Sequence, residues 1–188
     1  YTGFGRTGRW FASEHFGVMP DVICLGKALT GGFPLSACVG RADVMDRAWL
    51  ESDGEAIHTS TFLGHPVGCA MALASLHELE SKKLVSRSAE MGELFFAKLR
   101  RLAKRLGQAR SRPRGCGLML ALELFDECKP PKAIALTVTK RLLAEGFILL
   151  PEGEPANILS ITPPLTIGKT HIARFTRALG QALEDAYS

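Results

Sequence analysis

The chain has 188 residues, of which 46% are hydrophobic and 22% are charged. This composition is typical of a folded globular protein and excludes disordered and fibrous classes. The net charge of +4 is spread along the chain. The densest basic run, residues 98–114, lacks the interleaved aromatic residues of a nucleic-acid module, so we expect no nucleic-acid partner. No apolar run reaches membrane length and no signal peptide is present, so we expect no membrane partner.

The five cysteines are odd in number and scattered. They form no C-x-x-C pair and no zinc pattern, so we expect no metal site. We predict reduced thiols and a cytoplasmic location. Cys24 and Cys38 lie inside apolar runs, where a free cysteine behaves as a small hydrophobic residue.

The first motif in the chain is "GFGRTG" at residues 3–8. It matches the glycine fingerprint of dinucleotide-binding folds, which requires a buried strand before it and a helix after it. Only two residues precede it, and residues 9–21 show no helical apolar period. We therefore interpret it as a glycine-rich loop that needs backbone freedom and not as a nucleotide site.

The apolar runs 21–26 and 34–40 predict two strands buried on both faces, as in a parallel sheet. Residues 41–50 suit a short helix, and residues 55–65 a polar loop. Pro66 suits the first turn of a helix that continues to about residue 83. A long amphipathic helix is predicted over 85–106, with one apolar face formed by Phe95, Leu99, Leu102 and Leu106.

In the second half, residues 109–117 break the chain. Alternating leucines predict a half-buried strand over 118–125. The remaining predictions are a helix closed by Gly146, strands in 147–153 and 157–165, and a helix over 169–187. We expect an α/β fold with part of a large parallel-sheet domain in residues 1–88. An α+β small domain in 89–188 follows, and the long helix bridges the two.

Lys27 is the strongest candidate for a reactive residue. It leaves the carboxyl end of a predicted buried strand, where α/β folds bind their ligands. Gly26 before it and Gly31 and Gly32 after it leave room for a flat ring. A lysine in a poorly hydrated site loses basicity and acts as a nucleophile that forms Schiff bases. The alternative is a strand-end lysine that reaches solvent.

The stretch "YTGFGRTGRWFASEHFGVMPDVICLGKALTGGFPLSACVG" resembles the cofactor-lysine segment of the class III pyridoxal-phosphate-dependent aminotransferases. This family includes the ornithine, acetylornithine and 4-aminobutyrate aminotransferases. The similarity continues in "HTSTFLGHPVGCAMALASLHELE" and, more weakly, in "RGCGLMLALEL" and "LSITPPLTI". It implies fold type I, with a large α/β domain and a smaller C-terminal domain.

The resemblance also implies site residues. Lys27 forms the Schiff base with pyridoxal phosphate. Thr61, with Ser60 beside it, reaches the cofactor phosphate of the neighbouring subunit, which implies a homodimer. The segment 60–66 opens a predicted helix, and a helix N-terminus attracts phosphate. Without the resemblance, Ser60 and Thr61 have the alternative of an ordinary helix cap.

The implied reaction moves an amino group from an amino acid or amine to a 2-oxo acid or aldehyde. In the family, the carboxylate that binds the pyridine nitrogen lies just upstream of the glycine loop, before Tyr1. We therefore expect this chain to be the C-terminal portion of a longer transaminase and to be inactive alone. Two alternatives remain: an aminomutase or decarboxylase on the same scaffold, and a non-catalytic truncated domain.

One departure from the family bears on substrate choice. Relatives of the ornithine and 4-aminobutyrate type often carry an arginine in the strand before "PPL", which binds a carboxylate by two parallel hydrogen bonds. This chain has Ser160 there. The sequence does not choose between a carboxylate held elsewhere and an amine donor that has none at this position.

Overall fold

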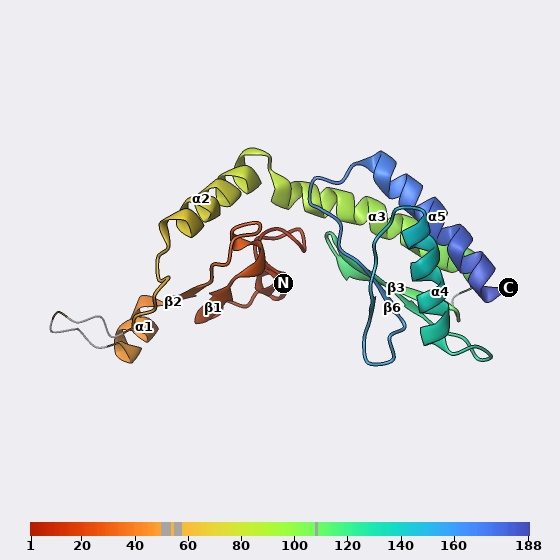
Figure 1. Ribbon diagram of the computed structural model, residues 1–188, viewed down its shortest axis with the longest axis horizontal. Helices are drawn as coiled ribbons and strands as arrows, with labels where there is room; N and C mark the ends of the chain where they lie inside the picture. Colours follow the sequence, from red (N-terminus) through yellow and green to blue (C-terminus); the bar gives the residue numbers. More distant parts are fainter. Residues whose placement is uncertain (50–53, 55–57, 108) are drawn as a thin grey trace.

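The computed structural model describes residues 1–49, 54, 58–107 and 109–188 (Figure 1). Of the loop predicted over 55–65, residues 55–57 lie outside this description. No helix within the described ranges is long and apolar enough to span a membrane. In chain order the elements are η1 (Ala12–Phe16), β1 (Val22–Leu25), η2 (Lys27–Leu29), β2 (Ala37–Gly40), α1 (Ala42–Ala48), α2 (Pro66–Ser81), α3 (Leu84–Leu106), β3 (Ser111–Cys116), β4 (Met119–Leu124), α4 (Pro131–Ala144), β5 (Pro151–Glu152), β6 (Ile158–Ile161) and α5 (Lys169–Tyr187).

The C-terminal part is a four-stranded antiparallel sheet covered by helices (Figure 1). The strand order is β3-β4-β6-β5. Helices α3 and α4 contact the sheet, and α5 packs against both of them. The predicted strand over 118–125 and the helices ending at Leu106, Gly146 and Tyr187 are confirmed within two residues. Their apolar faces form one core, because the four alternating leucines of 118–124 are all buried.

Two strand predictions in this part need correction. The segment 109–117 was expected only to break the chain, but Ser111–Cys116 forms β3 and pairs with β4 along its whole length. β3 is an edge strand, and an edge tolerates Pro113 and the flanking arginines because one row of its backbone groups is unpaired. The strand expected over 147–153 is reduced to Pro151–Glu152, and Ile148 and Leu150 are exposed.

The N-terminal strands also differ from the prediction. β1 and β2 form a two-stranded antiparallel pair, not a parallel one, and their residues are half-buried or exposed. Cys24 and Cys38, expected to be buried small hydrophobic residues, are both exposed. The segment 26–36 between the strands explains the direction. A parallel pair needs a crossover of about a dozen residues or more, usually with a helix, and this segment is too short.

A second, smaller apolar cluster lies between the N-terminal loop, η2 and α2. It consists of Phe4, Leu29, Ala72, Leu79 and Leu84. Leu165 packs against this cluster and also against the core of the C-terminal sheet. The domain boundary that we predicted at residues 88 and 89 falls inside α3, which contributes Leu84 to this cluster and Phe95 and Leu99 to the core of the C-terminal sheet.

The "GFGRTG" stretch is a loop of turns, as predicted, and it joins the two parts of the chain. The Arg6 guanidinium donates hydrogen bonds to the carbonyls of Leu118 and Pro163, and the Arg6 carbonyl accepts one from the Leu118 amide at 3.0 Å. Gly8 has a φ of +83° and lies against Ala89 of α3. The glycines are therefore needed for close packing between this loop, α3 and the turn after β3.

Gly92 of α3 is the tightest point of this packing. A Cβ at Gly92 would lie 2.2 Å from the carbonyl oxygen of Gly117. An alanine at a helix interior ordinarily stabilises by up to about 1 kcal/mol over glycine. Here we expect Gly92→Ala to destabilise the chain by about 1–3 kcal/mol, because backbone cannot yield as a side chain can. Urea unfolding followed by circular dichroism measures this.

Glu93→Ala, at the exposed next position of the same helix, is the matched control. We expect Glu93→Ala to change the free energy of unfolding by less than about 0.5 kcal/mol. Equal effects of the two substitutions would contradict the close approach of Gly92 to Gly117.

Tyr187 is buried at the end of the C-terminal core, and its hydroxyl group meets two backbone carbonyls. The hydroxyl lies 2.6 Å from the carbonyl of Arg110 and 3.1 Å from that of Phe125, and it has one proton to donate to them. Burial raises the pKa of Tyr187 from 10.0 to about 12. The neutral phenol therefore stabilises the fold below pH 10, and this contribution is lost as the pH rises towards 12.

We expect the free energy of unfolding to fall by about 2 kcal/mol over this pH window. Tyr187→Phe should remove that part of the pH dependence while it lowers stability at neutral pH by about 1 kcal/mol. Chemical unfolding of both proteins between pH 9 and 12 provides the comparison. The same pH slope in both proteins would exclude the buried phenol as its source.

Candidate functional site

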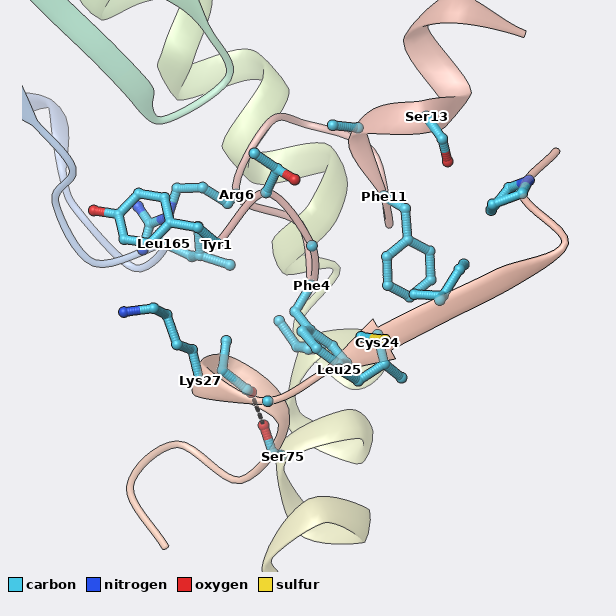
Figure 2. A pocket seen from close by; sticks show the side chains of 18 of the residues that line it. Tyr1, Phe4, Arg6, Phe11, Ser13, Cys24, Leu25, Lys27, Ser75 and Leu165 are labelled. Atoms are coloured by element: carbon cyan, nitrogen blue, oxygen red, sulfur yellow. Dashed lines mark hydrogen bonds between the residues drawn. The ribbon is translucent and has the colours of Figure 1, made fainter. Parts of the chain in front are cut away.

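A cleft of about 710 Å³ lies between the N-terminal loop, β1, η2 and the segment that follows β6 (Figure 2). Its volume falls within the range of about 300–1,000 Å³ that is common for small-molecule sites. Lys27 lines this cleft together with Tyr1, Arg6, Thr162 and Leu165. Thus residues from both ends of the chain meet around the lysine that the sequence singled out.

The position of Lys27 follows from the residues after it. β1 ends at Leu25, and Lys27 begins the single turn η2, which the Leu29 amide closes on the Gly26 carbonyl at 2.6 Å. Leu29 is buried in the small apolar cluster, and this packing holds the turn in place. The Ser75 hydroxyl of α2 also donates to the Ala28 carbonyl at 3.5 Å. The backbone at Lys27 is held by its neighbours while its side chain faces the cleft.

The ε-amino group of Lys27 lies over the aromatic ring of Tyr1. Its nitrogen lies 5.3 Å from the centroid of the Tyr1 ring, on the electron-rich face, and Figure 2 shows the two side chains on one side of the cleft. Within the described part of the chain, Lys27 makes no hydrogen bond and no ion pair. A side chain without a committed partner is available to a reactant that enters the cleft.

The charge of the cleft is positive. Lys27 and Arg6 both line it, and none of the described lining residues is acidic. Burial lowers the pKa of Arg6 from its ordinary value. The Arg6 guanidinium is occupied by the carbonyls of Leu118 and Pro163, whereas Lys27 is free. The arrangement attracts an anionic ligand and leaves one amine free to react with it.

Ser60 and Thr61 are not brought to this cleft. Both are exposed and lie in the turn before α2, and neither is among the described residues that line the cleft around Lys27. The alternative of a helix cap for Ser60 and Thr61 is wrong. His65 is the N-cap of α2, and its Nδ1 accepts a hydrogen bond from the Gly68 amide at 3.5 Å.

Ser160 lies in a neighbouring hollow of about 830 Å³. It sits on β6 opposite Ala121 and is half-buried. Tyr1 and Thr162 line both hollows. Ser160 therefore lies in a hollow that shares Tyr1 and Thr162 with the Lys27 cleft, and it does not itself line that cleft.

Sequence reasoning gave no role to Arg6, Tyr1, Thr162 or Leu165. Arg6 is 157 positions from its partner Pro163, so no local pattern joins the two. A signal did exist, because both the glycine loop and "LSITPPLTI" were among the motifs that resemble the family. The glycine loop and "LSITPPLTI" resemble the family and had no assigned role, so they could have been predicted to contribute to one shared site.

Comparison with known proteins supports this assembly of motifs. The family model for aminotransferase class-III matches residues 1–183. The chain is 36% identical to a 4-aminobutyrate aminotransferase from Mycobacterium leprae and 37% identical to a leucine/methionine racemase from Thermococcus litoralis. Each of these alignments covers 98% of this chain and 40% of the relative.

A solved structure gives the same result for the fold. The crystal structure of the ornithine aminotransferase from Toxoplasma gondii ME49 matches with a TM-score of 0.84 and 33% sequence identity, over 99% of this chain and 42% of that chain. The chain thus spans about two fifths of the length of these proteins. The predicted fold class, an α/β fragment of fold type I, is confirmed, with the antiparallel β1–β2 pair as the correction within it. The match over residues 1–183 establishes that the chain belongs to the class III aminotransferases.

Proposed function

We propose that the chain is part of a longer transaminase that transfers an amino group from an amino acid or amine to a 2-oxo acid or aldehyde. The observation that carries this proposal is the unpaired Lys27 amine in a positively charged cleft. The family match and the aminotransferase relatives support it. A coupled assay with 2-oxoglutarate or pyruvate as the amino acceptor tests it. No transfer to any 2-oxo acid or aldehyde would overturn it.

The proposed cofactor is pyridoxal phosphate, which supplies an electron sink for the carbon that carries the amino group. The residues present fit one end of this group. The cleft has the size for a small aromatic ligand, Lys27 offers a free amine, and the aromatic ring of Tyr1 stands beside it. A partner for the pyridine nitrogen is a carboxylate, and the described cleft residues contain none.

Lys27 has two roles in this proposal. Its amine binds the cofactor covalently between reaction cycles. When a substrate amine replaces it there, the freed Nζ takes the proton from the substrate carbon and returns it at the acceptor position. Both roles need a side chain that moves without breaking an ion pair, and this is the situation of Lys27.

We propose that Ser60 and Thr61 bind the cofactor phosphate of a neighbouring subunit in a cytoplasmic homodimer. Their exposure and their absence from the described lining of the Lys27 cleft support a role outside their own subunit. Hydroxyl and amide donors in a turn before a helix suit a phosphate.

A mixed dimer tests the assignment across the interface. One subunit carries Lys27→Ala and the other Thr61→Val. If Thr61 acts across the interface, one of the two sites contains both defects and the other is intact, so about half of the activity of the unmodified dimer remains. If Thr61 acts within its own subunit, both sites are defective and the activity is lost. Thr59→Val, two positions earlier in the same exposed segment, is the control.

A second reaction on the same cofactor is favoured by one observation. The relative from Thermococcus litoralis is named a leucine/methionine racemase, and its identity of 37% matches that of the aminotransferases. A racemase keeps the amino group on its substrate, as an aminomutase does. The alternatives to transamination are therefore racemisation, amino-group migration within one substrate, and decarboxylation. Consumption of a 2-oxo acid marks transamination. Loss of optical activity without such consumption marks racemisation.

We also propose that the 188-residue chain alone does not turn over substrate. The absence of a carboxylate from the described cleft residues supports this. Measurable turnover by the isolated chain with pyridoxal phosphate would contradict it.

A further inference from the structure

Arg6 connects the N-terminal loop to the C-terminal side of the Lys27 cleft. Its guanidinium Nη1 donates hydrogen bonds to the carbonyls of Leu118, at 3.2 Å, and Pro163. Its own carbonyl accepts one from the Leu118 amide at 3.0 Å and one from the Ser88 hydroxyl at 3.3 Å. One residue of the glycine loop therefore contacts α3, the turn between β3 and β4, and the segment that follows β6.

The segment after β6 needs such contacts because its backbone has few donors of its own. Residues 163 and 164 are both proline, so neither has an amide proton. The carbonyl of the first proline accepts its hydrogen bond from Arg6. Further along, Arg87 of α3 donates to the carbonyls of Thr166, at 3.4 Å, and Ile167, at 2.7 Å. Two arginines from the preceding part of the chain thus hold this segment by its carbonyls.

The same segment forms one wall of the Lys27 cleft. Thr162 and Leu165 line the cleft together with Lys27 and with Arg6 itself. Figure 2 shows Arg6 and Leu165 on the side of the cleft toward which the Lys27 side chain extends. Thr162 directly precedes the proline whose carbonyl Arg6 binds. The hydrogen bond from Arg6 therefore fixes where this wall stands relative to the Lys27 amine.

We propose, on the basis of the proposed function, that Arg6 is a positioning residue for amino transfer at Lys27. Arg6 holds the wall in place through the Pro163 carbonyl, and the wall residues Thr162 and Leu165 confine a substrate beside the Lys27 amine. A reactant that is confined in this way needs less ordering before it reacts. Arg6 acts through the wall and has no role in making or breaking bonds.

The surroundings of Arg6 explain what an arginine contributes here. Burial lowers the pKa of Arg6 from its ordinary value, yet a guanidinium keeps its proton in proteins, so its hydrogen bonds to the carbonyls are charge-assisted. Its main chain is anchored in the interior, because Ser88 and Leu118 are both fully buried. All of these contacts join residues of this chain to one another, so they do not depend on what the rest of a longer protein covers.

Steady-state kinetics of Arg6→Gln in the longer enzyme test the assignment. Glutamine is shorter and uncharged, so it cannot bridge the two carbonyls. We expect KM for the amino donor to rise about tenfold while kcat stays within about threefold, because the wall supports substrate and transition state alike. A lower kcat with an unchanged KM would show only a loss of folded enzyme and would overturn the proposal.

Arg6→Lys separates the hydrogen bonds of Arg6 from its charge. Lysine keeps the charge, but its nitrogen is one bond nearer to the main chain and is a compact point charge without the planar fork of a guanidinium. We expect Arg6→Lys to show a rise in KM similar to that of Arg6→Gln. A KM equal to that of the unmodified enzyme would show that charge alone suffices, and it would overturn the assigned role.

Arg87→Gln is the matched control for these variants. Arg87 makes bonds of the same kind to the same segment, but Thr166 and Ile167 lie outside the described lining of the Lys27 cleft, as does Arg87. We expect its KM to stay within about twofold of that of the unmodified enzyme. An equal rise in KM in Arg87→Gln and Arg6→Gln would show general loosening of the segment and would contradict a specific role of Arg6.

Hydrogen exchange reads the same contact without substrate or cofactor. Exchange is followed by mass spectrometry in peptides that cover residues 159–168, with α4 as the internal reference. We expect exchange at 162–167 to be faster on the order of tenfold in Arg6→Lys, since local opening becomes easier, and exchange in α4 to be unchanged. Equal exchange in the variant and the unmodified protein would overturn the proposal. An unmodified enzyme without any amino transfer would instead overturn the proposed function, and the exchange result would still be readable.

Discussion

Lys27→Ala is expected to abolish amino transfer by the longer enzyme. Loss of a positioned acid–base group alone lowers kcat by about 10²–10⁴-fold, and this substitution also removes the nucleophile. Lys27→Arg should be as inactive, because a guanidinium keeps the positive charge but neither loses its proton nor attacks a carbonyl. The comparison of the two variants separates chemistry at Nζ from simple attraction of an anion to the cleft. Initial rates with saturating donor and acceptor provide the measurement.

Lys140→Ala is the control for this pair of variants. Lys140 is an exposed residue of α4 and does not line the Lys27 cleft. We expect its kcat to stay within about twofold of the unmodified enzyme, since surface substitutions away from a site change little. Substantial activity in Lys27→Arg would show that positive charge suffices and would contradict the assigned role.

The largest expected loss of stability follows from Phe95→Ala. Phe95 is 1% exposed and meets Phe175 edge to face, with ring centroids 5.6 Å apart. Phe175 in turn contacts Phe147 at 5.3 Å. Removing the first ring leaves a cavity where α3, α5 and the sheet meet. We expect the free energy of unfolding to fall by about 3–5 kcal/mol, measured by urea unfolding.

Phe16→Ala provides the contrast, because Phe16 is 79% exposed. Its expected effect is below about 0.5 kcal/mol in either direction. If Phe95→Ala and Phe16→Ala lowered the unfolding midpoint equally, the aromatic core between α3 and α5 would not be what stabilises the C-terminal part.

The sequence predicted most of the C-terminal part because its elements are amphipathic and local. In α5 the residues Ile172, Phe175, Leu179 and Leu183 follow the helical spacing, and all four are buried. The alternating leucines of β4 behave in the same way with period two. One-sided burial leaves a periodic trace that can be found without knowledge of the partner.

The direction in which strands pair leaves no periodic pattern in the sequence. The apolar composition of 21–26 and 34–40 indicated strands but not their direction, and we inferred parallel burial where the pair is antiparallel. The short connection between them was the available signal. β3 was missed because Pro113 and two arginines, Arg112 and Arg114, hide its period, and its edge position explains how it tolerates them.

The residues of the candidate site could be predicted only in part, for the same reason. Lys27 was found because it follows a strand and lies among glycines. Arg6 and Thr162 were not, because their place in the cleft depends on contacts between the two ends of the chain. Ser60 and Thr61 were assigned by resemblance, and the turn they occupy leads into His65, whose ring packs against Phe33 with ring centroids 5.1 Å apart. No local pattern encodes that contact.

The central claim is that Lys27 is the residue that bonds the cofactor. Borohydride reduction of the longer enzyme with pyridoxal phosphate, followed by tryptic mapping, tests it most directly. Modification blocks cleavage after Lys27, so the account predicts one labelled peptide that covers residues 10–41 and carries the cofactor mass on Lys27. Label on another lysine, or no label on an enzyme that is active, would contradict the account.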